Sequence, residues 1–175
     1  MATRSIISIK LENDEYKAIY CHHDGYLTHN GALLLDHYNT REKVEELLKL
    51  GDLSCLAKKI KPNPKKPHSF EFDQRQDDVV VAYGRDRGES GTEAKILSLK
   101  EMFEESWIDY YYIFTFENEW KYYDGNKREL RDVKEDLDKE YERMGIKRPE
   151  SFYGFWTPST LADEIKKQTS NDELE

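Results

Sequence analysis

The chain has 175 residues, which is enough for one domain with a hydrophobic core. Charged residues make up 36% and the net charge is −9, which argues against nucleic-acid binding through a basic surface. The 12 Tyr, 7 Phe and 3 Trp exclude a disordered chain, because they can bury a large apolar area. The chain has two cysteines, no signal-peptide pattern and no apolar run near the ~20 residues of a membrane span. We therefore expect a cytoplasmic protein with reduced thiols and no membrane partner.

The first third of the chain predicts a β-hairpin followed by helices. Apolar and polar side chains alternate over residues 6–11, which predicts a half-buried strand, and residues 16–21 form the returning strand after a polar turn. Asparagine caps predict one helix over residues 30–38 and a second over residues 39–51. A further short helical piece is expected over residues 53–60.

The middle of the chain combines a basic loop with a strongly hydrophobic run. Prolines make residues 58–67 a loop, expected to protrude as a solvated insertion in an acidic protein. The lysines of this loop are Lys58, Lys59, Lys61, Lys65 and Lys66. Residues 70–72 predict a short edge strand, and the apolar run 79–83 predicts a central strand buried on both faces. A charged loop with glycines follows over residues 84–91, and residues 93–97 predict another strand.

The last part of the chain carries the clearest local signals. Residues 98–101 match a capping box that begins a short helix. Aromatic residues predict a hairpin over residues 110–123. Apolar residues at three- and four-residue steps predict a helix over residues 127–144, and an aromatic segment with a last helix follows over residues 150–168. The acidic tail, residues 169–175, is expected to fray.

Together these elements define a fold class. We expect a single α+β domain over residues 1–168, with a mainly antiparallel sheet and helices packed on it. The chain contains no internal repeat and no composition shift that would indicate a second domain.

Two stretches end a hydrophobic run in dense charge, and we expect them to form the site. The first follows the initial hairpin and supplies His22, His23, Asp24 and His29. The second follows the run 79–83 and supplies Tyr83, Arg85, Asp86 and Arg87. Because each stretch follows a strand, we expect the two strand ends to meet on one rim of the domain.

The arginines give the strongest indication of a ligand. Arginine presents a rigid fork of donors that suits phosphate, and Arg85 and Arg87 share a face in an extended loop. Asp86 then points away and is expected to hold His22 or His29. The competing interpretation is an internal Arg–Asp network that fastens the loop.

Other chemistries have weaker support. Residues 21–24 are all metal-ligand types, but neighbours on a strand point to opposite faces, so no metal site is predicted. Cys21 with His22 or His29 can form a nucleophile and its base, or Cys21 can be a small buried residue. No P-loop ending or GxGxxG motif is present, so no cofactor is expected and no catalytic residue is assigned. The aromatic hairpin can stack bases, or it can serve the sheet and core.

Five patches of the chain form an ordered set of motifs. They are the Met-Ala-Thr-Arg-Ser start, Tyr-Cys-His-His-Asp-Gly-Tyr at 20–26 with His-Asn-Gly at 29–31, Tyr-Asn-Thr at 38–40, Leu-Gly-Asp-Leu-Ser at 50–54 and Ala-Tyr-Gly-Arg-Asp-Arg-Gly-Glu at 82–89. Together they resemble the motifs of a family of small proteins from tailed bacteriophages and prophage-bearing bacteria. The resemblance covers roughly the first two-thirds of the chain, and many relatives carry Trp at the position of His23. It implies a phage accessory protein and no catalytic activity.

These observations lead to three hypotheses of function. The first is an accessory protein that antagonises a host defence by sequestering a phosphorylated small molecule such as a nucleotide signal, with Arg85 and Arg87 on the phosphates. The second is an inhibitor whose acidic surface binds a host nucleic-acid-binding or defence protein. The third is a small enzyme that uses Cys21 or the histidines. No direct nucleic-acid partner is expected. The protein is expected to act in the cytoplasm of an infected bacterium.

Overall fold

The computed structural model describes residues 2–104, 107–150 and 152–174, and the side chains as far as residue 170. Its strands are β1 (Ser5–Lys10), β2 (Glu15–Cys21), β3 (Leu53–Cys55), β4 (Val81–Ala82), β5 (Lys95–Ser98), β6 (Tyr110–Phe114), β7 (Trp120–Asp124) and β8 (Arg131–Asp132). Its α-helices are α1 (Ala32–His37), α2 (Arg41–Leu48), α3 (Tyr83–Arg87), α4 (Leu99–Phe103), α5 (Val133–Met144) and α6 (Pro158–Leu174). A π-helical turn, Leu27–Gly31, leads into α1, and a 3-10 turn spans Phe72–Gln74.

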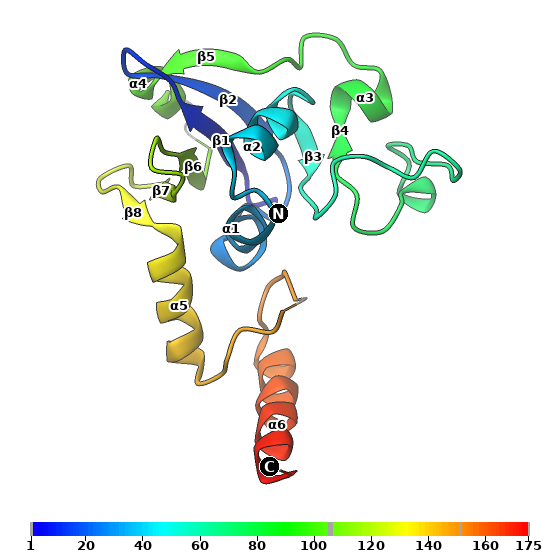
Figure 1. Cartoon of the computed structure of the whole chain (residues 1–175), viewed down its shortest axis with the longest axis vertical. Coiled ribbons are helices and arrows are strands. Elements are labelled where there is room, and N and C mark those ends of the chain that lie inside the picture. Colours follow the sequence, from blue (N-terminus) through cyan, green and yellow to red (C-terminus); the bar gives the residue numbers. More distant parts are fainter. Residues whose placement is uncertain (1, 105–106, 151, 175) are drawn as a thin grey trace.

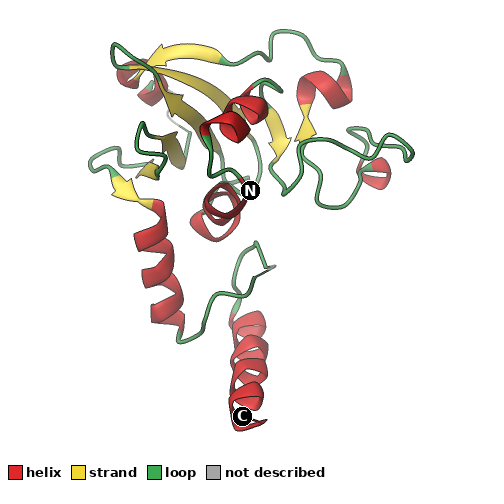
Figure 2. Cartoon of the chain, in the orientation of Figure 1, coloured by secondary structure: helices red, strands yellow, loops and turns green. Residues whose placement is uncertain are grey.

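The strands form one mixed sheet of eight strands within the described residues (Figures 1 and 2). The order is β4-β3-β2-β1-β6-β7-β8, and β5 pairs with the free part of β2. The β1–β6 and β2–β3 pairings are parallel, and the other pairings between named strands are antiparallel. The predicted single α+β domain is therefore confirmed.

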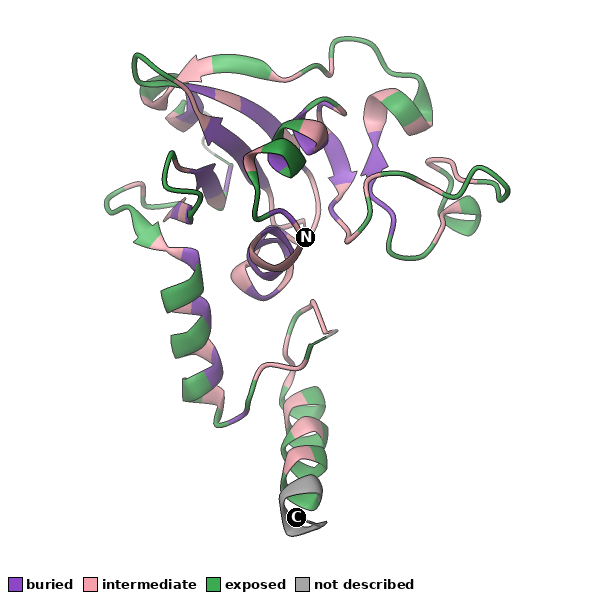
Figure 3. Cartoon of the chain, in the orientation of Figure 1, coloured by how far each residue is buried: buried purple, intermediate pink, exposed green. Residues whose placement is uncertain are grey.

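The centre of the sheet is β1, which is buried on both faces (Figure 3). Ile7 and Ile9 pack into the core with helices α1 and α2, whereas Ile6 packs with Met102 of α4 on the opposite face. The prediction of a half-buried strand is wrong, because β6 joins β1 from a hundred residues away and α4 covers the second face. Ser8 is fully buried there, and its hydroxyl donates to the carbonyl of Tyr112 at 2.8 Å.

The hydrophobic run 79–83 occupies the edge of the sheet and not its centre. Only Val81 and Ala82 form β4, which pairs with β3 alone at the end of the strand order, and the chain turns directly into α3. Residues 59 and 68 cover this edge, because the Val80 N–H donates to the Lys59 carbonyl and the His68 ring contacts the Val80 carbonyl. Because this segment covers the edge strand, the run 79–83 is buried and therefore as hydrophobic as a central strand. The prediction of a central strand is wrong for this reason.

Two shorter predictions in the same region are also wrong. Residues 53–60 were expected to be helical, but they begin with strand β3, which pairs in parallel with the end of β2. Residues 70–72 were expected to form an edge strand, but Phe72 begins a 3-10 turn instead. Both segments are too short for periodicity to distinguish one backbone conformation from another.

The C-terminal part follows most of the local signals, although the helix predicted over residues 127–144 begins only at Val133, after strand β8. Ser98 and Glu101 form the reciprocal capping box of α4, and Gly145 ends α5 in the left-handed conformation. The segment after α5 is fastened to α1, because Arg148 forms a two-pronged ion pair with Asp36 at 2.6 and 2.8 Å. Helix α6 then points away from the sheet (Figure 1) and includes residues 169–174, for which the sequence predicted a frayed tail.

Candidate functional site

The two charged stretches lie at opposite ends of their strands and do not meet. Strands β2 and β3 are parallel, and the chain after Cys21 continues along β3, where the N–H groups of His22 and His23 donate to Leu53 and Ser54. Strand β4 runs antiparallel to β3, so the chain after Ala82 leaves in the other direction and Tyr83 bonds to Asp52. The predicted meeting of the strand ends is therefore wrong.

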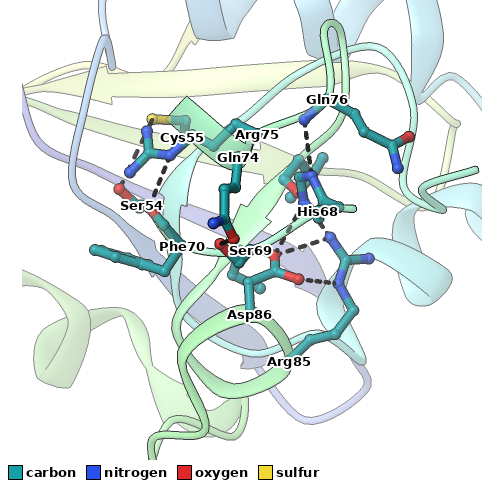
Figure 4. A network of polar contacts seen from close by, with 12 residues as sticks. Ser54, Cys55, His68, Ser69, Phe70, Gln74, Arg75, Gln76, Arg85 and Asp86 are labelled. Carbon is teal, nitrogen blue, oxygen red and sulfur yellow. Dashed lines mark hydrogen bonds and ion pairs between the residues drawn. The ribbon is translucent and has the colours of Figure 1, made fainter. Parts of the chain in front are cut away.

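Arg85 and Asp86 form an internal network (Figure 4). The Arg85 guanidinium donates to both carboxylate oxygens of Asp86, at 2.9 and 3.0 Å, and to the carbonyls of Val80 and Ile60. Asp86, whose side chain is only 4% exposed, also accepts from the N–H of Ala82. Burial alone raises the pKa of Asp86, but these hydrogen bonds outweigh it and hold that pKa below its usual value. Arg85 and Asp86 therefore form the internal Arg–Asp network that was the competing interpretation of the sequence.

The histidine beside Asp86 is His68, and not His22 or His29 as expected. Its Nε2 lies 3.4 Å from the Asp86 carboxylate and 3.2 Å from the Val80 carbonyl, while its Nδ1 accepts from the N–H of Gln76. Accepting at Nδ1 places the ring proton on Nε2. His68 therefore belongs to the packing of the sheet edge.

Arg87 is exposed and packs against the aromatic rings of Phe70 and the half-buried Tyr83. The Arg87 guanidinium lies 4.6 Å from the ring centre of Phe70 and 5.4 Å from that of Tyr83, and its Nε pairs with Glu89 at 3.2 Å. The side chain is half exposed. Arg87 does not share an anion clamp with Arg85, whose donors are directed inward.

The first stretch, in contrast, forms the wall of a surface hollow. The turn at Gly25 is held from two sides, because its N–H donates to Thr3 and its carbonyl accepts from the buried Tyr112 hydroxyl at 2.6 Å. A side chain at Gly25 would place its Cβ 2.9 Å from the Thr3 carbonyl oxygen, so only glycine fits. The close approach of Thr3 therefore fixes the position of the preceding histidines and Asp24.

Asn30 contributes to the same support. The sequence assigned it to a helix cap, but it lies within the π-helical turn and is fully buried. Its Nδ2 lies within hydrogen-bonding distance of Ser5 Oγ, Cys21 Sγ and the His23 carbonyl, at 3.2–3.4 Å. Its Oδ1 lies 2.8 Å from His29 Nδ1, and His29 does not line the hollow.

The hollow has a volume of about 1050 Å³ and is acidic. Its carboxylates are Asp24, Asp109 and Asp124, its imidazoles are His22 and His23, and its rings are Tyr26, Tyr110 and Phe155. None of the described residues that line it is a lysine or arginine. The sequence analysis missed Asp109 and Asp124, although Asp109 directly precedes β6 and the register pairs Tyr110 with Asp124. The sequence signal that could have identified them is a pair of acidic residues at the open end of the predicted aromatic hairpin.

His22 adds little positive charge to the hollow. Burial lowers the pKa of His22, and the neighbouring His23 and Arg4 lower it further, while its Nδ1 lies 2.7 Å from the Tyr20 hydroxyl. Burial and the nearby Asp24 carboxylate raise the pKa of Tyr26 to about 12. At neutral pH His22 is therefore uncharged and Tyr26 keeps its proton, so the carboxylates set the charge of the hollow.

Cys21 is placed where it cannot act as a nucleophile. Its side chain is fully buried, and burial raises the pKa of the thiol to about 12. The thiol contacts Asn30 and the carbonyl of His23. Among residues 2–104, 107–150 and 152–174, no group of three or more His, Cys, Asp or Glu side chains is arranged to hold a metal ion.

Comparisons with protein-family models, curated proteins and solved structures find no match to this chain. No helix in the described part of the chain is long and apolar enough to cross a membrane. The site itself is therefore the basis for any statement about function.

Proposed function

We propose that this chain is a phage accessory protein that acts by binding, and that its acidic hollow receives a basic segment of a host protein in the bacterial cytoplasm. The phage origin rests on the motifs shared with tailed-phage proteins. The observation that carries the binding proposal is a hollow with three carboxylates and no lysine or arginine among its described lining residues. Such a site attracts cations and repels phosphates.

The three carboxylates keep their charge uncompensated, although each accepts one hydrogen bond within the protein. Asp109 accepts from the Arg4 N–H at 3.0 Å, Asp124 from the Asn126 N–H at 2.9 Å, and Asp24 from the Tyr26 hydroxyl. Among the described residues, no ion pair joins Asp24, Asp109 or Asp124 to a basic side chain. The acids of α5 differ, because Glu135 pairs with Lys139 at 3.0 Å and Asp138 with Lys134 at 3.1 Å on the same helix. The hollow therefore offers more uncompensated negative charge than the helix does.

The rings of the hollow suit the same ligand. Phe155 is 69% exposed, and its ring meets Tyr26 edge to face at 6.0 Å. A lysine or arginine side chain combines an apolar stem with a charged head, and aromatic faces attract that head. Carboxylates and rings that line one hollow thus fit a basic side chain, whereas a phosphorylated small molecule there would meet acids and no lysine or arginine among the described lining residues.

The proposal is tested with a tetra-arginine peptide as the probe and calorimetric titration as the measurement. A variant with Asp24→Asn, Asp109→Asn and Asp124→Asn keeps hydrogen-bond acceptors and removes the charges. We expect it to bind roughly tenfold or more weakly, since each exposed ion pair contributes ~0.2–1 kcal/mol. Binding to the natural chain should also weaken with added salt, because exposed charges are screened.

A matched control separates the hollow from the overall charge. Glu12→Gln, Glu117→Gln and Glu142→Gln change the net charge by the same amount at exposed positions outside the hollow. This control should bind the peptide about as well as the natural chain. Equal losses in both variants would mean that only the net charge attracts the peptide, and the hollow would then be rejected as the site.

A further inference from the structure

The basic loop at residues 58–67 and the segment that follows it form an ordered lobe. Here the lysine lobe denotes residues 58–77, which contain six lysines and arginines against three acids. Gln76 lies at its centre: the side-chain amide donates to the carbonyls of Asn63 and Lys66 at 2.9 and 3.0 Å, and its oxygen accepts from the Asn63 N–H. The N–H of Gln76 donates to His68 (Figure 4). The lobe is thus held in one conformation.

A basic groove lies in this lobe. The groove has a volume of about 620 Å³, and its charged lining residues are Lys59, Lys61, Lys66, Arg75, Asp73 and Asp77. Within the described residues, Lys59 and Lys66 form no ion pair, and the pair of Lys61 with Glu46 is long at 3.9 Å. Because four basic side chains line the groove against two acids, the groove is positively charged and attracts an anion. The groove shares no residue with the acidic hollow.

An exposed aromatic ring lies beside one of these cations, Arg75. Phe72 is 86% exposed, although the 3-10 turn at residues 72–74 is held by the hydrogen bond from Gln74 N–H to the Glu71 carbonyl. The Arg75 guanidinium lies 5.6 Å from the Phe72 ring centre and is itself fixed by a 2.9 Å bond to the Phe70 carbonyl. A ring and a guanidinium plane presented together at the surface form a platform on which a flat base can stack.

We propose that the lysine lobe binds nucleotide units, with a phosphate on Lys59, Lys61 and Lys66 and a base stacked against Phe72 and Arg75. This site takes the role that the sequence predicted for Arg85 and Arg87, whose side chains are engaged elsewhere. A free nucleotide and a single strand of nucleic acid share this chemistry. The acidic remainder of the chain opposes capture at long range, so affinity comes from contacts at the lobe.

The proposal is tested with two probes, a fluorescent nucleoside diphosphate and a fluorescent single-stranded oligothymidylate. Fluorescence anisotropy is measured at about 50 and 200 mM salt, since phosphate contacts make affinity fall with salt. Lys59→Gln, Lys61→Gln and Lys66→Gln together should weaken binding at least tenfold and reduce its salt dependence. Phe72→Ala should weaken binding roughly five- to a hundredfold with little change in salt dependence.

Controls come from the same chain. Lys65→Gln removes an exposed lysine of the lobe that lies outside the groove, and Phe116→Ala removes another exposed ring. Both should bind like the natural chain. Binding of both probes supports a single-nucleotide site, and binding of the oligonucleotide alone supports a site for a strand. No binding of either probe, or equal losses in the lobe and control variants, overturns the proposal.

Discussion

The Tyr112 hydroxyl donates a 2.6 Å hydrogen bond to the Gly25 carbonyl, which joins the centre of β6 to the turn that carries the site histidines. Tyr112 is fully buried, and burial holds the pKa of its hydroxyl well above the usual value. The hydroxyl is therefore a permanent donor at physiological pH. This long-range contact adds to the bond from the Gly25 N–H to Thr3 and to the bonds from the His22 and His23 N–H groups to β3 in holding the wall of the hollow.

Tyr112→Phe should destabilise the protein and loosen the hollow. The substitution keeps the ring but leaves the Gly25 carbonyl without its buried donor, which costs about 1–3 kcal/mol in the free energy of unfolding. Urea denaturation followed by circular dichroism measures the loss. Tyr123→Phe, which changes a less buried hydroxyl in the same hairpin, is the control. An unchanged midpoint in Tyr112→Phe would show that water replaces the hydroxyl.

Arg85→Ala and Arg87→Ala should differ in their effect on stability. Arg85→Ala leaves the buried Asp86 carboxylate without its partner, so we expect a loss of about 2–3 kcal/mol, less than the ~3–5 kcal/mol of a fully buried pair because Arg85 is partly exposed. Arg87→Ala removes an exposed pair and a stacking contact and should cost within about 1 kcal/mol. Similar losses in chemical denaturation would contradict the internal network.

The contribution of Asp86 should disappear in acid. Its pKa is lower in the folded protein than in the unfolded chain, where it is ~3.9, so its stabilising effect is complete above that pH and is lost as the pH falls through the folded value. Asp86→Asn should therefore be clearly less stable than the natural chain at pH 7, and the difference should shrink below about pH 4. Urea titrations at several pH values measure it, and a constant difference would be contrary to this assignment.

His22 should titrate below the ordinary histidine value of ~6.5. Burial, His23 and Arg4 all disfavour its charged form. His23→Gln should raise the pKa of His22 toward the ordinary value, whereas His37→Gln, a change outside the hollow, should leave it unchanged. Nuclear magnetic resonance of the ring protons follows the titration. A normal pKa for His22 in the natural chain would place the ring in solvent.

Cys21 should resist thiol reagents while the protein is folded. The thiol is fully buried with a pKa of about 12, whereas Cys55 is partly exposed, although burial raises its pKa too. In the Cys55→Ser variant, iodoacetamide should modify Cys21 only after denaturation. The Cys21→Ala variant reports on Cys55 separately. Rapid modification of Cys21 in the native protein would reopen the hypothesis of a reactive cysteine.

Features that depend on residues a few positions apart were determined by the sequence alone. The capping box of Ser98 and Glu101, the left-handed stop at Gly145 and the aromatic hairpin appear as predicted. In each, the hydrogen bonds that define the feature join near neighbours, so the residue pattern carries the information. The charged stretch at residues 22–24 was likewise recognised, because an apolar strand ends there in polar side chains.

The places of β1, β4 and the charged residues were decided only by the tertiary structure. The central position of β1 depends on β6, and the burial of β4 at the sheet edge depends on Lys59 and His68, which its own hydrophobic run does not specify. The sequence left open whether Arg85 binds a ligand or fastens the loop, because two of its acceptors, the carbonyls of Ile60 and Val80, are backbone groups that every residue has. Asp109 and Asp124 lie in the same hollow as Asp24 because of how the strands of the sheet pair. Such long-range partners leave no local pattern, because many residues satisfy the same geometry.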